Sequence, residues 1–215
     1  MGIKNLLFPT RNLCYFCRER SLDIEGRICN DCREKLVFVN KEIEIESKYI
    51  SRTIYCLIYN KYLKELIHNF KFNGKSYLYK PFAEIMMQPI LEKGFDKADL
   101  IIFIPIHRRK EAIRGYNQSE LLAGYISKKL EKPLSQGNLT KTKWTREQNT
   151  LDRVERIKNL RESFSLKNAN EIYGKRILLI DDIITTGSTF DECAKTLTRS
   201  GAKEINCLAL TSGRI

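Results

Sequence analysis

Residues 176–189, RILLIDDIITTGST, constrain the fold of this chain more than any other part of its sequence. Residues 177–180 form a continuous apolar run, which is typical of a strand buried on both faces of a parallel sheet. Asp181 and Asp182 follow at once. Because two adjacent carboxylates repel each other, a purely structural segment gains little from them. We therefore expect a cation or hydroxyl groups beside this acid pair.

The segment after the acid pair has the composition of a phosphate-binding loop. Residues 185–189, TTGST, lead into a helix expected from Ser188. Backbone N–H groups, hydroxyls and the positive end of that helix together favour an anion, and Gly187 lets the backbone approach it closely. In an open α/β sheet, ligands bind beyond the carboxyl ends of the strands. The acid pair would accept hydrogen bonds from two vicinal hydroxyls, and the loop beside it would bind a phosphate. A ligand with both groups is a ribose 5-phosphate.

Strands and helices alternate along the chain. Asn117 with Glu120, and Ser188 with Asp191, form capping patterns before apolar helical faces, and Gly201 closes the second helix. The sequence predicts strands at residues 53–60, 98–106, 177–180 and 203–210, and helices at residues 61–72, 76–93, 117–130 and 188–200. Residues 41–49 are charged and alternating, as in a linker or an edge strand. This order favours an α/β domain with a mainly parallel sheet flanked by helices.

Four cysteines near the N-terminus have the spacing C-x2-C-x11-C-x2-C. They are Cys14, Cys17, Cys29 and Cys32. Two such pairs can point four thiolates at one ion, which predicts a closed, structural zinc site. A redox-active C-x-x-C motif and disulfides are the alternatives. The other three cysteines, Cys56, Cys193 and Cys207, lie in apolar or helical contexts and are interpreted as buried thiols.

The length of 215 residues allows one good core and a small appendage. We predict a cysteine module at residues 1–45 and the α/β domain at residues 46–215. No apolar run reaches the length of a membrane helix, and residues 1–14 do not resemble a signal peptide. The expected location is the cytoplasm.

The net charge of +12 is concentrated in one region. Residues 107–161 hold 14 Lys and Arg against 6 Asp and Glu. Such a concentration indicates polyanionic partners, either phosphorylated small molecules or nucleic acid, or both. A solvated basic surface without a partner is the alternative.

Two stretches carry a resemblance to known families. ILLIDDIITTGST resembles the phosphoribosyl-pyrophosphate (PRPP) signature of type I phosphoribosyltransferases. The order of cysteine pairs, IPIHRRKEAIRGYNQSELLA, REQNTLDRVERIKNLRESF and this signature resembles the ComF family over nearly the whole chain. The resemblance implies a type I phosphoribosyltransferase fold behind a zinc-ribbon-like module, and an association with bacterial DNA uptake.

The resemblance also implies roles for individual residues. Asp181 and Asp182 would bind the ribose hydroxyls and would be the catalytic residues. The 5-phosphate would be bound by Thr185, Thr186, Gly187, Ser188 and Thr189. The pyrophosphate would lie near Arg108, Arg109 and Arg114, with Mg²⁺ bridging its oxygens and those of the ribose. A loop at residues 141–153 would cover the ligand, with Arg146 as a clamp.

Two functions follow from these features. One is an enzyme that transfers phosphoribosyl to an unknown acceptor. The other is a protein that senses PRPP or binds single-stranded DNA without turnover, alongside other competence or DNA-processing proteins. Residues for nucleic-acid contacts would be Lys141, Lys143, Trp144 and Arg146. A nucleotide triphosphatase is rejected because a P-loop ending at NGKS would need glycine where the chain has Asn69.

Overall fold

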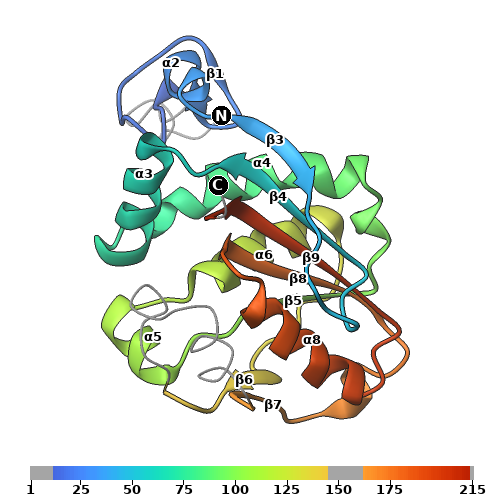
Figure 1. Ribbon diagram of the computed structural model, residues 1–215. Helices are drawn as coiled ribbons and strands as arrows, with labels where there is room; N and C mark the ends of the chain where they lie inside the picture. The colour runs from blue at the N-terminus through green and yellow to red at the C-terminus, as the bar shows by residue number, and fades with distance from the viewer. Residues whose placement is uncertain (1–11, 145–161, 214–215) are drawn as a thin grey trace, which may run out of the picture.

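The structure, a computed structural model, describes residues 12–144 and 162–213. A five-stranded sheet forms its centre, in the order β3–β4–β9–β8–β5 (Figure 1). The strands are β3 (Phe38–Glu42), β4 (Arg52–Ile58), β5 (Leu100–Phe103), β8 (Arg176–Ile184) and β9 (Glu204–Ser212). All neighbours are parallel except β3, which is antiparallel to β4. The predicted mainly parallel α/β sheet is confirmed.

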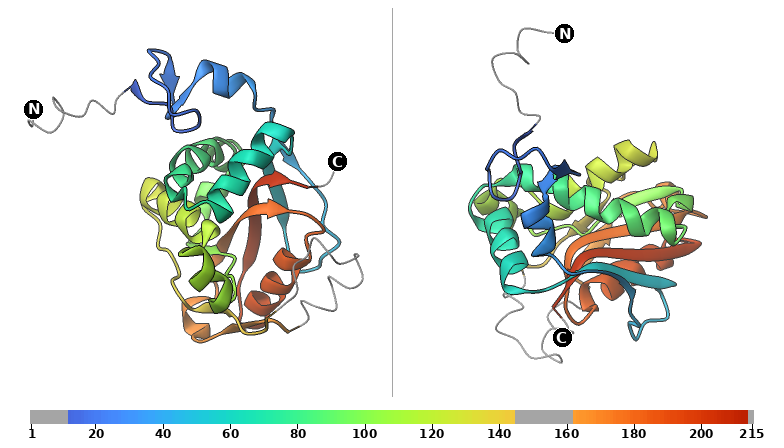
Figure 2. Two further views of the ribbon diagram at one scale, coloured as in Figure 1. Left: turned by 90° about the vertical axis from the view of Figure 1, so that its left-hand side faces the viewer. Right: turned by 90° about the horizontal axis from the view of Figure 1, so that it is seen from above.

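Helices cover both faces of this sheet (Figure 2). On one face lie α3 (Lys61–Phe72), α4 (Tyr79–Glu92) and α6 (Gln118–Leu130), and on the other lies α8 (Ser188–Arg199). Ile180 packs in the core of the first face and Leu179 in that of the second, because successive strand residues point to opposite sides. The apolar run of β8 is therefore buried on both faces.

The remaining described elements are short. They are β1 (Ile24–Glu25), β2 (Ile28–Cys29), α2 (Asn30–Glu34), η2 (Ser76–Leu78), η3 (Phe95–Lys97), α5 (Arg108–Arg114), β6 (Leu139–Lys141), β7 (Phe164–Leu166) and η5 (Ala169–Glu171). Strands β1 and β2 form one small antiparallel sheet, and β6 and β7 form another. Within residues 12–144 and 162–213, no helix is both long enough and apolar enough to cross a membrane.

The cysteine-bearing segment shares a core with the α/β domain. The ring of Phe16 lies 5.4 Å from that of Phe82 in α4 and 6.5 Å from that of Tyr62 in α3, measured between centroids. Ile28 and Leu36 belong to the same buried cluster. In addition, β3 precedes the predicted boundary at residue 45 but pairs with β4 as an edge of the main sheet. The predicted modules are thus joined by packing and by strand pairing.

Two local predictions are wrong. The strand predicted to end at Ile180 continues to Ile184, because β9 remains paired with β8 beyond the acid pair. The capping box of Ser188 with Asp191 is absent: the N-cap of α8 is Gly187, and no side chain caps it. Ser188 is instead the first helical residue, and its backbone N–H donates to Oγ1 of Thr186 at 3.3 Å.

We predict that Phe82→Ala lowers the free energy of unfolding by about 3–5 kcal/mol. Phe82 is fully buried, and its ring packs between Phe16 of the cysteine segment and Phe70 of α3. The substitution removes contacts that join two parts of the core and leaves a cavity. Urea unfolding followed by circular dichroism measures the loss.

Leu91→Ala is the matched control, because Leu91 lies on the same helix but is 58% exposed. We expect a change below about 0.5 kcal/mol for this variant. Equal losses in the two variants would show that Phe82 does not join the cysteine segment to the domain.

Candidate functional site

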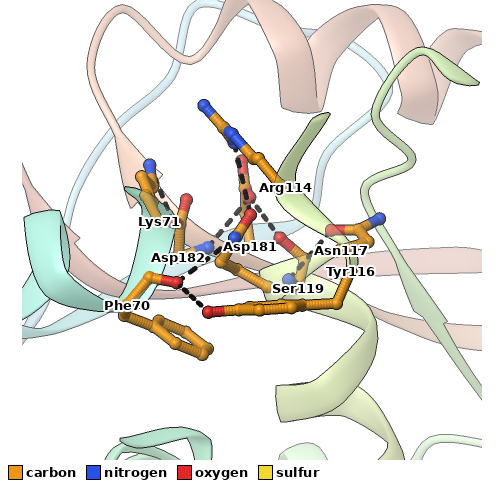
Figure 3. A network of polar contacts seen from close by, with 9 residues as sticks. Phe70, Lys71, Arg114, Tyr116, Asn117, Ser119, Asp181 and Asp182 are labelled. Carbon is orange, nitrogen blue, oxygen red and sulfur yellow. Dashed lines mark hydrogen bonds and ion pairs between the residues drawn. The ribbon is translucent and has the colours of Figure 1, made fainter. Parts of the chain in front are cut away.

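The acid pair lies where β8 extends beyond its neighbour β5. The last pair of residues between these strands is Phe103 with Ile180, so Asp181 and Asp182 have β9 on one side only. Oδ1 of Asp181 accepts hydrogen bonds from Oγ of Ser119 at 2.7 Å and from the backbone N–H of Asp182 at 2.9 Å. Oδ2 of Asp182 is 2.7 Å from Nζ of Lys71 (Figure 3). The hydroxyl group and the cation expected beside the pair are thus Ser119 and Lys71.

Hydrogen bonds hold the segments that carry these two partners. The Asn117 side chain donates to the carbonyl of Ile104 at 3.0 Å and accepts from the N–H of Ser119 at 3.0 Å, which caps α6 at the end of β5. The carbonyl of Phe70 accepts a hydrogen bond from the hydroxyl of Tyr116 at 2.5 Å (Figure 3). It accepts a second one from the Gln118 side chain at 3.4 Å. The end of α3 is therefore fixed to the start of α6.

Burial changes the acid–base properties of two groups beside the cavity. It raises the pKa of Asp181 to about 7, and the charge of Asp182 adds to the effect, while the hydrogen bond from Ser119 opposes it. Burial lowers the pKa of Lys141 to about 8, because the charged ammonium is poorly solvated there. Both groups can therefore change charge near neutral pH.

The loop at residues 185–189 turns sharply into α8. Gly187 has a φ of +83°, which is unfavourable for any residue with a Cβ atom, and an added Cβ would lie 2.9 Å from the side chain of Ile45. Oγ1 of Thr186 lies 2.7 Å from Oγ of Ser188. Thr185, Gly187 and Thr189 lie beside the acid pair at the positive end of α8, an arrangement suited to a phosphate.

A cavity of about 510 Å³ brings many of the predicted residues together. Those that line it are Asp181, Asp182, Thr185, Gly187, Thr189, Arg114 and Lys141. Those that do not line it are Thr186, Ser188, Arg108, Arg109, Lys143 and Trp144. Of the three arginines predicted for pyrophosphate, Arg114 is thus the one that reaches the cavity.

The residues predicted for nucleic acid separate into two groups. Lys141, at the end of β6, lines the cavity, whereas Lys143 and Trp144 are exposed. The Trp144 ring packs edge-on against His107 at 5.2 Å, and the guanidinium of Arg109 lies 5.9 Å from it. Arg146 and most of the predicted covering loop at residues 141–153 lie outside the described residues.

The sequence analysis did not assign a role to Lys71 or to Ser119. Lys71 is one of several lysines in an amphipathic helix, so periodicity does not distinguish it. Ser119 follows the capping residue Asn117, which explained that stretch without it. Only the fold places both beside the acid pair, since they precede it by more than sixty residues.

The four N-terminal cysteines form a compact cluster in which all sulfur atoms lie within 4.8 Å of one another. Cys17 and Cys29 have their Sγ atoms 3.9 Å apart, close to the roughly 3.8 Å expected for thiolates in a tetrahedron with metal–sulfur bonds of about 2.3 Å. The Sγ of Cys14 accepts hydrogen bonds from the backbone N–H groups of Phe16 and Cys29, both at 3.4 Å. The cluster could hold a metal ion, and its four sulfur ligands are consistent with zinc.

We predict that Asp181→Asn stabilises the protein at pH 8 and has little effect near pH 4. The native state holds a proton on Asp181 up to about pH 7, whereas the unfolded chain releases it near pH 4. As the pH rises through this window, the wild type therefore loses stability that the variant keeps. At pH 8 we expect the free energy of unfolding of the variant to be higher by about 1–3 kcal/mol.

Denaturant unfolding across pH 4–8 tests this, with Asp96→Asn as a control outside the cavity. If the free energy of unfolding changed with pH in the same way for the wild type and Asp181→Asn, the raised pKa of the buried Asp181 would be contradicted.

Comparison with known proteins relates this site to a family. The model of the phosphoribosyl transferase domain matches residues 117–214, which include the acid pair and its loop. Competence protein ComFC of Bacillus subtilis is 31% identical over 207 residues, with 91% of this chain and 82% of that protein covered. DNA utilization protein YhgH of Shigella flexneri is 32% identical over 155 residues, with 69% of this chain and 67% of that protein covered.

Competence protein F of Haemophilus influenzae is 32% identical, covering 69% of this chain and 67% of that protein. Among solved structures, purine phosphoribosyltransferase from Pyrococcus horikoshii has 18% identity and a TM-score of 0.42, with 63% of this chain and 74% of that chain covered. The region that the family model matches contains β8, with the acid pair and the start of its loop, and the neighbouring parallel strand β9. The chain belongs to the ComF family of competence-associated proteins and has the type I phosphoribosyltransferase fold.

Proposed function

We propose that this chain binds PRPP together with Mg²⁺ in the cavity beside the acid pair and acts in DNA uptake. The observation that carries the proposal is that Asp181 and Asp182 line one cavity together with Thr185, Gly187 and Thr189 of the following loop. The names of the relatives, competence protein and DNA utilization protein, support the biological role. Other competence or DNA-processing proteins are the expected partners.

The charge of the cavity favours a ligand with several phosphates. Two carboxylates line it, against five lysine and arginine side chains. These cations are Lys64, Lys71, Lys110, Arg114 and Lys141. A cleft lined mainly by one sign of charge concentrates ligands of the opposite sign. PRPP, which carries a 5-phosphate and a pyrophosphate on one ribose, satisfies this requirement.

Each group of the cavity has a role in this proposal. The acid pair accepts hydrogen bonds from the ribose hydroxyls, and the start of α8 with its preceding loop binds the 5-phosphate. Arg114 binds the pyrophosphate, because a guanidinium donates two parallel hydrogen bonds to phosphate oxygens. Mg²⁺, which prefers oxygen ligands, supplies further positive charge at the pyrophosphate when it is bound.

Transfer of phosphoribosyl to an acceptor is the proposed reaction of this site. The acceptor displaces pyrophosphate at C1 of the sugar through a state with oxocarbenium character. Such a reaction mainly requires stabilisation of the departing negative charge and exclusion of water. The cations of the cavity suit the first requirement.

Binding without turnover, with single-stranded DNA as partner, is the second candidate. The exposed ring of Trp144, with Arg109 and His107 packed against it, favours it. Aromatic rings next to cations provide stacking surfaces for unpaired bases.

We predict that PRPP binds the wild type in a magnesium-dependent manner and that Asp182→Asn weakens binding by at least about tenfold. The variant loses a charged acceptor of hydrogen bonds from the sugar, which is worth about 1.5–3 kcal/mol. Isothermal titration calorimetry with and without Mg²⁺ gives both affinities, and Asp96→Asn serves as a charge-matched control.

The absence of binding heat from the folded wild type would overturn PRPP binding. In that case we expect single-stranded DNA to bind with an affinity that falls steeply with salt. Magnesium-dependent binding that is unchanged in Asp182→Asn would place PRPP elsewhere on the protein.

We also propose that the four N-terminal cysteines hold a structural zinc ion. Four thiolates leave no open position for a substrate. We predict one equivalent of zinc per chain by elemental analysis, and alkylation of these cysteines by iodoacetamide only after a chelator has removed the metal. In the sequence, Phe16 lies between Cys14 and Cys17, and its ring packs on the main core. Metal removal is therefore also expected to lower the melting temperature.

Cys32→Ser is expected to lose the metal, whereas Cys56→Ser, in the buried strand β4, is the control that retains it. A chelated protein with unchanged melting temperature and unreactive cysteines would exclude a structural metal.

A further inference from the structure

Lys71 forms an unusual contact at the end of α3. Its Nζ atom lies 2.7 Å from Oδ2 of Asp182, and the side chains of the two residues are only 19% and 8% exposed. Both residues line the cavity. An ammonium group this poorly hydrated depends on its partner, because taking either charge alone out of water is costly.

The backbone around Lys71 is fixed rather than free to follow the side chain. The carbonyl of the preceding residue, Phe70, accepts hydrogen bonds from Tyr116, as Figure 3 shows, and from Gln118. Lys71 can therefore change partners only by rotating its own side chain within the cavity.

Oxygen atoms of both carboxylates already have partners in this arrangement. Oδ1 of Asp181 accepts from Ser119 and from the backbone of Asp182, and Oδ2 of Asp182 contacts Lys71. A divalent cation that approached the pair would have to replace the ammonium or share the site with it. At separations of a few ångströms in a poorly hydrated site, repulsion between these cations opposes their sharing it.

We propose that Lys71 is an internal competitor for the acid pair, which keeps free divalent cations off Asp182 and leaves only when a ligand brings an anionic group to receive its ammonium. The cavity makes this exchange feasible, since Lys71 shares it with Lys110 and Arg114, where a polyphosphate would bind. Lys71 is thus a specificity-determining residue: a ribose ligand with an anionic group at C1 compensates the displaced ammonium, and a bare diol does not. The ligand's identity rests on the proposed function, but the competition with cations does not.

The test measures Mn²⁺ binding to the protein without any ligand, by electron paramagnetic resonance at pH 8. We expect weak binding to the wild type and an affinity at least about tenfold higher in Lys71→Met, because removal of the ammonium leaves the carboxylate of Asp182 without its cationic partner. Lys64→Met is the matched control: it removes a positive charge from the same helix and the same cavity without touching Asp182. The double variant Lys71→Met/Asp182→Asn should lose the gain, and Lys71→Arg should resemble the wild type.

Equal Mn²⁺ affinities for Lys71→Met and the wild type, or an equal gain in Lys64→Met, would overturn the proposal. If Lys71→Met does not fold, acetylation of lysines followed by mass spectrometry decides instead: Lys71 must react more slowly than Lys64 in the wild type and faster in Asp182→Asn. Equal rates in the wild type and Asp182→Asn would refute the competition.

The outcomes separate this proposal from the proposed function. A gain of Mn²⁺ binding without any PRPP binding would retain the role of Lys71 and reject PRPP as the ligand. PRPP binding to the wild type without a gain of Mn²⁺ binding in Lys71→Met would retain PRPP as the ligand and reject the role of Lys71.

Discussion

The accommodation of two adjacent carboxylates in a buried strand is the constraint on which the rest of the site depends. Asp181 and Asp182 cannot both be charged at low cost away from water, so each needs a partner. Ser119 reaches Asp181 from the start of α6, and Lys71 reaches Asp182 from the end of α3. The two helices must therefore meet at the point where β5 stops and β8 continues, and the cavity forms there.

The helix α3 connects this site with the cysteine cluster. Near its start, Tyr62 contacts Phe16, which lies between the ligand-type residues Cys14 and Cys17. Near its end, Lys71 contacts Asp182. Nine residues of helix span about 14 Å, so one rigid element extends from the cluster to the cavity. A metal in the cluster would stabilise the end of α3 that lies farthest from the acids, and would help to fix where the ammonium lies.

The parts of the site that lie within one short stretch of sequence could be predicted well. The acid pair and three residues of the loop that follows line one cavity, because a strand that leads directly into a helix keeps neighbours in sequence close in space. The extent of β8 could not be predicted from the apolar run, because its last four residues are held by backbone bonds to β9 that do not require apolar side chains. The capping box failed for a related reason: the turn at Gly187 already begins the helix, so Ser188 falls one position too late.

The sequence by itself determined the family, the alternation of strands and helices, the metal-type spacing of the cysteines and the chemistry of the acid pair with its loop. Local spacing and residue type suffice for these features. The tertiary structure decided that Lys71 and Ser119 complete the acid pair, that Arg114 and Lys141 reach the cavity, and that Arg108 and Arg109 remain outside it. The residues that reach the cavity come from other elements of the chain, and only the packing of α3, α5, α6 and β6 around the end of β5 brings them beside the carboxylates.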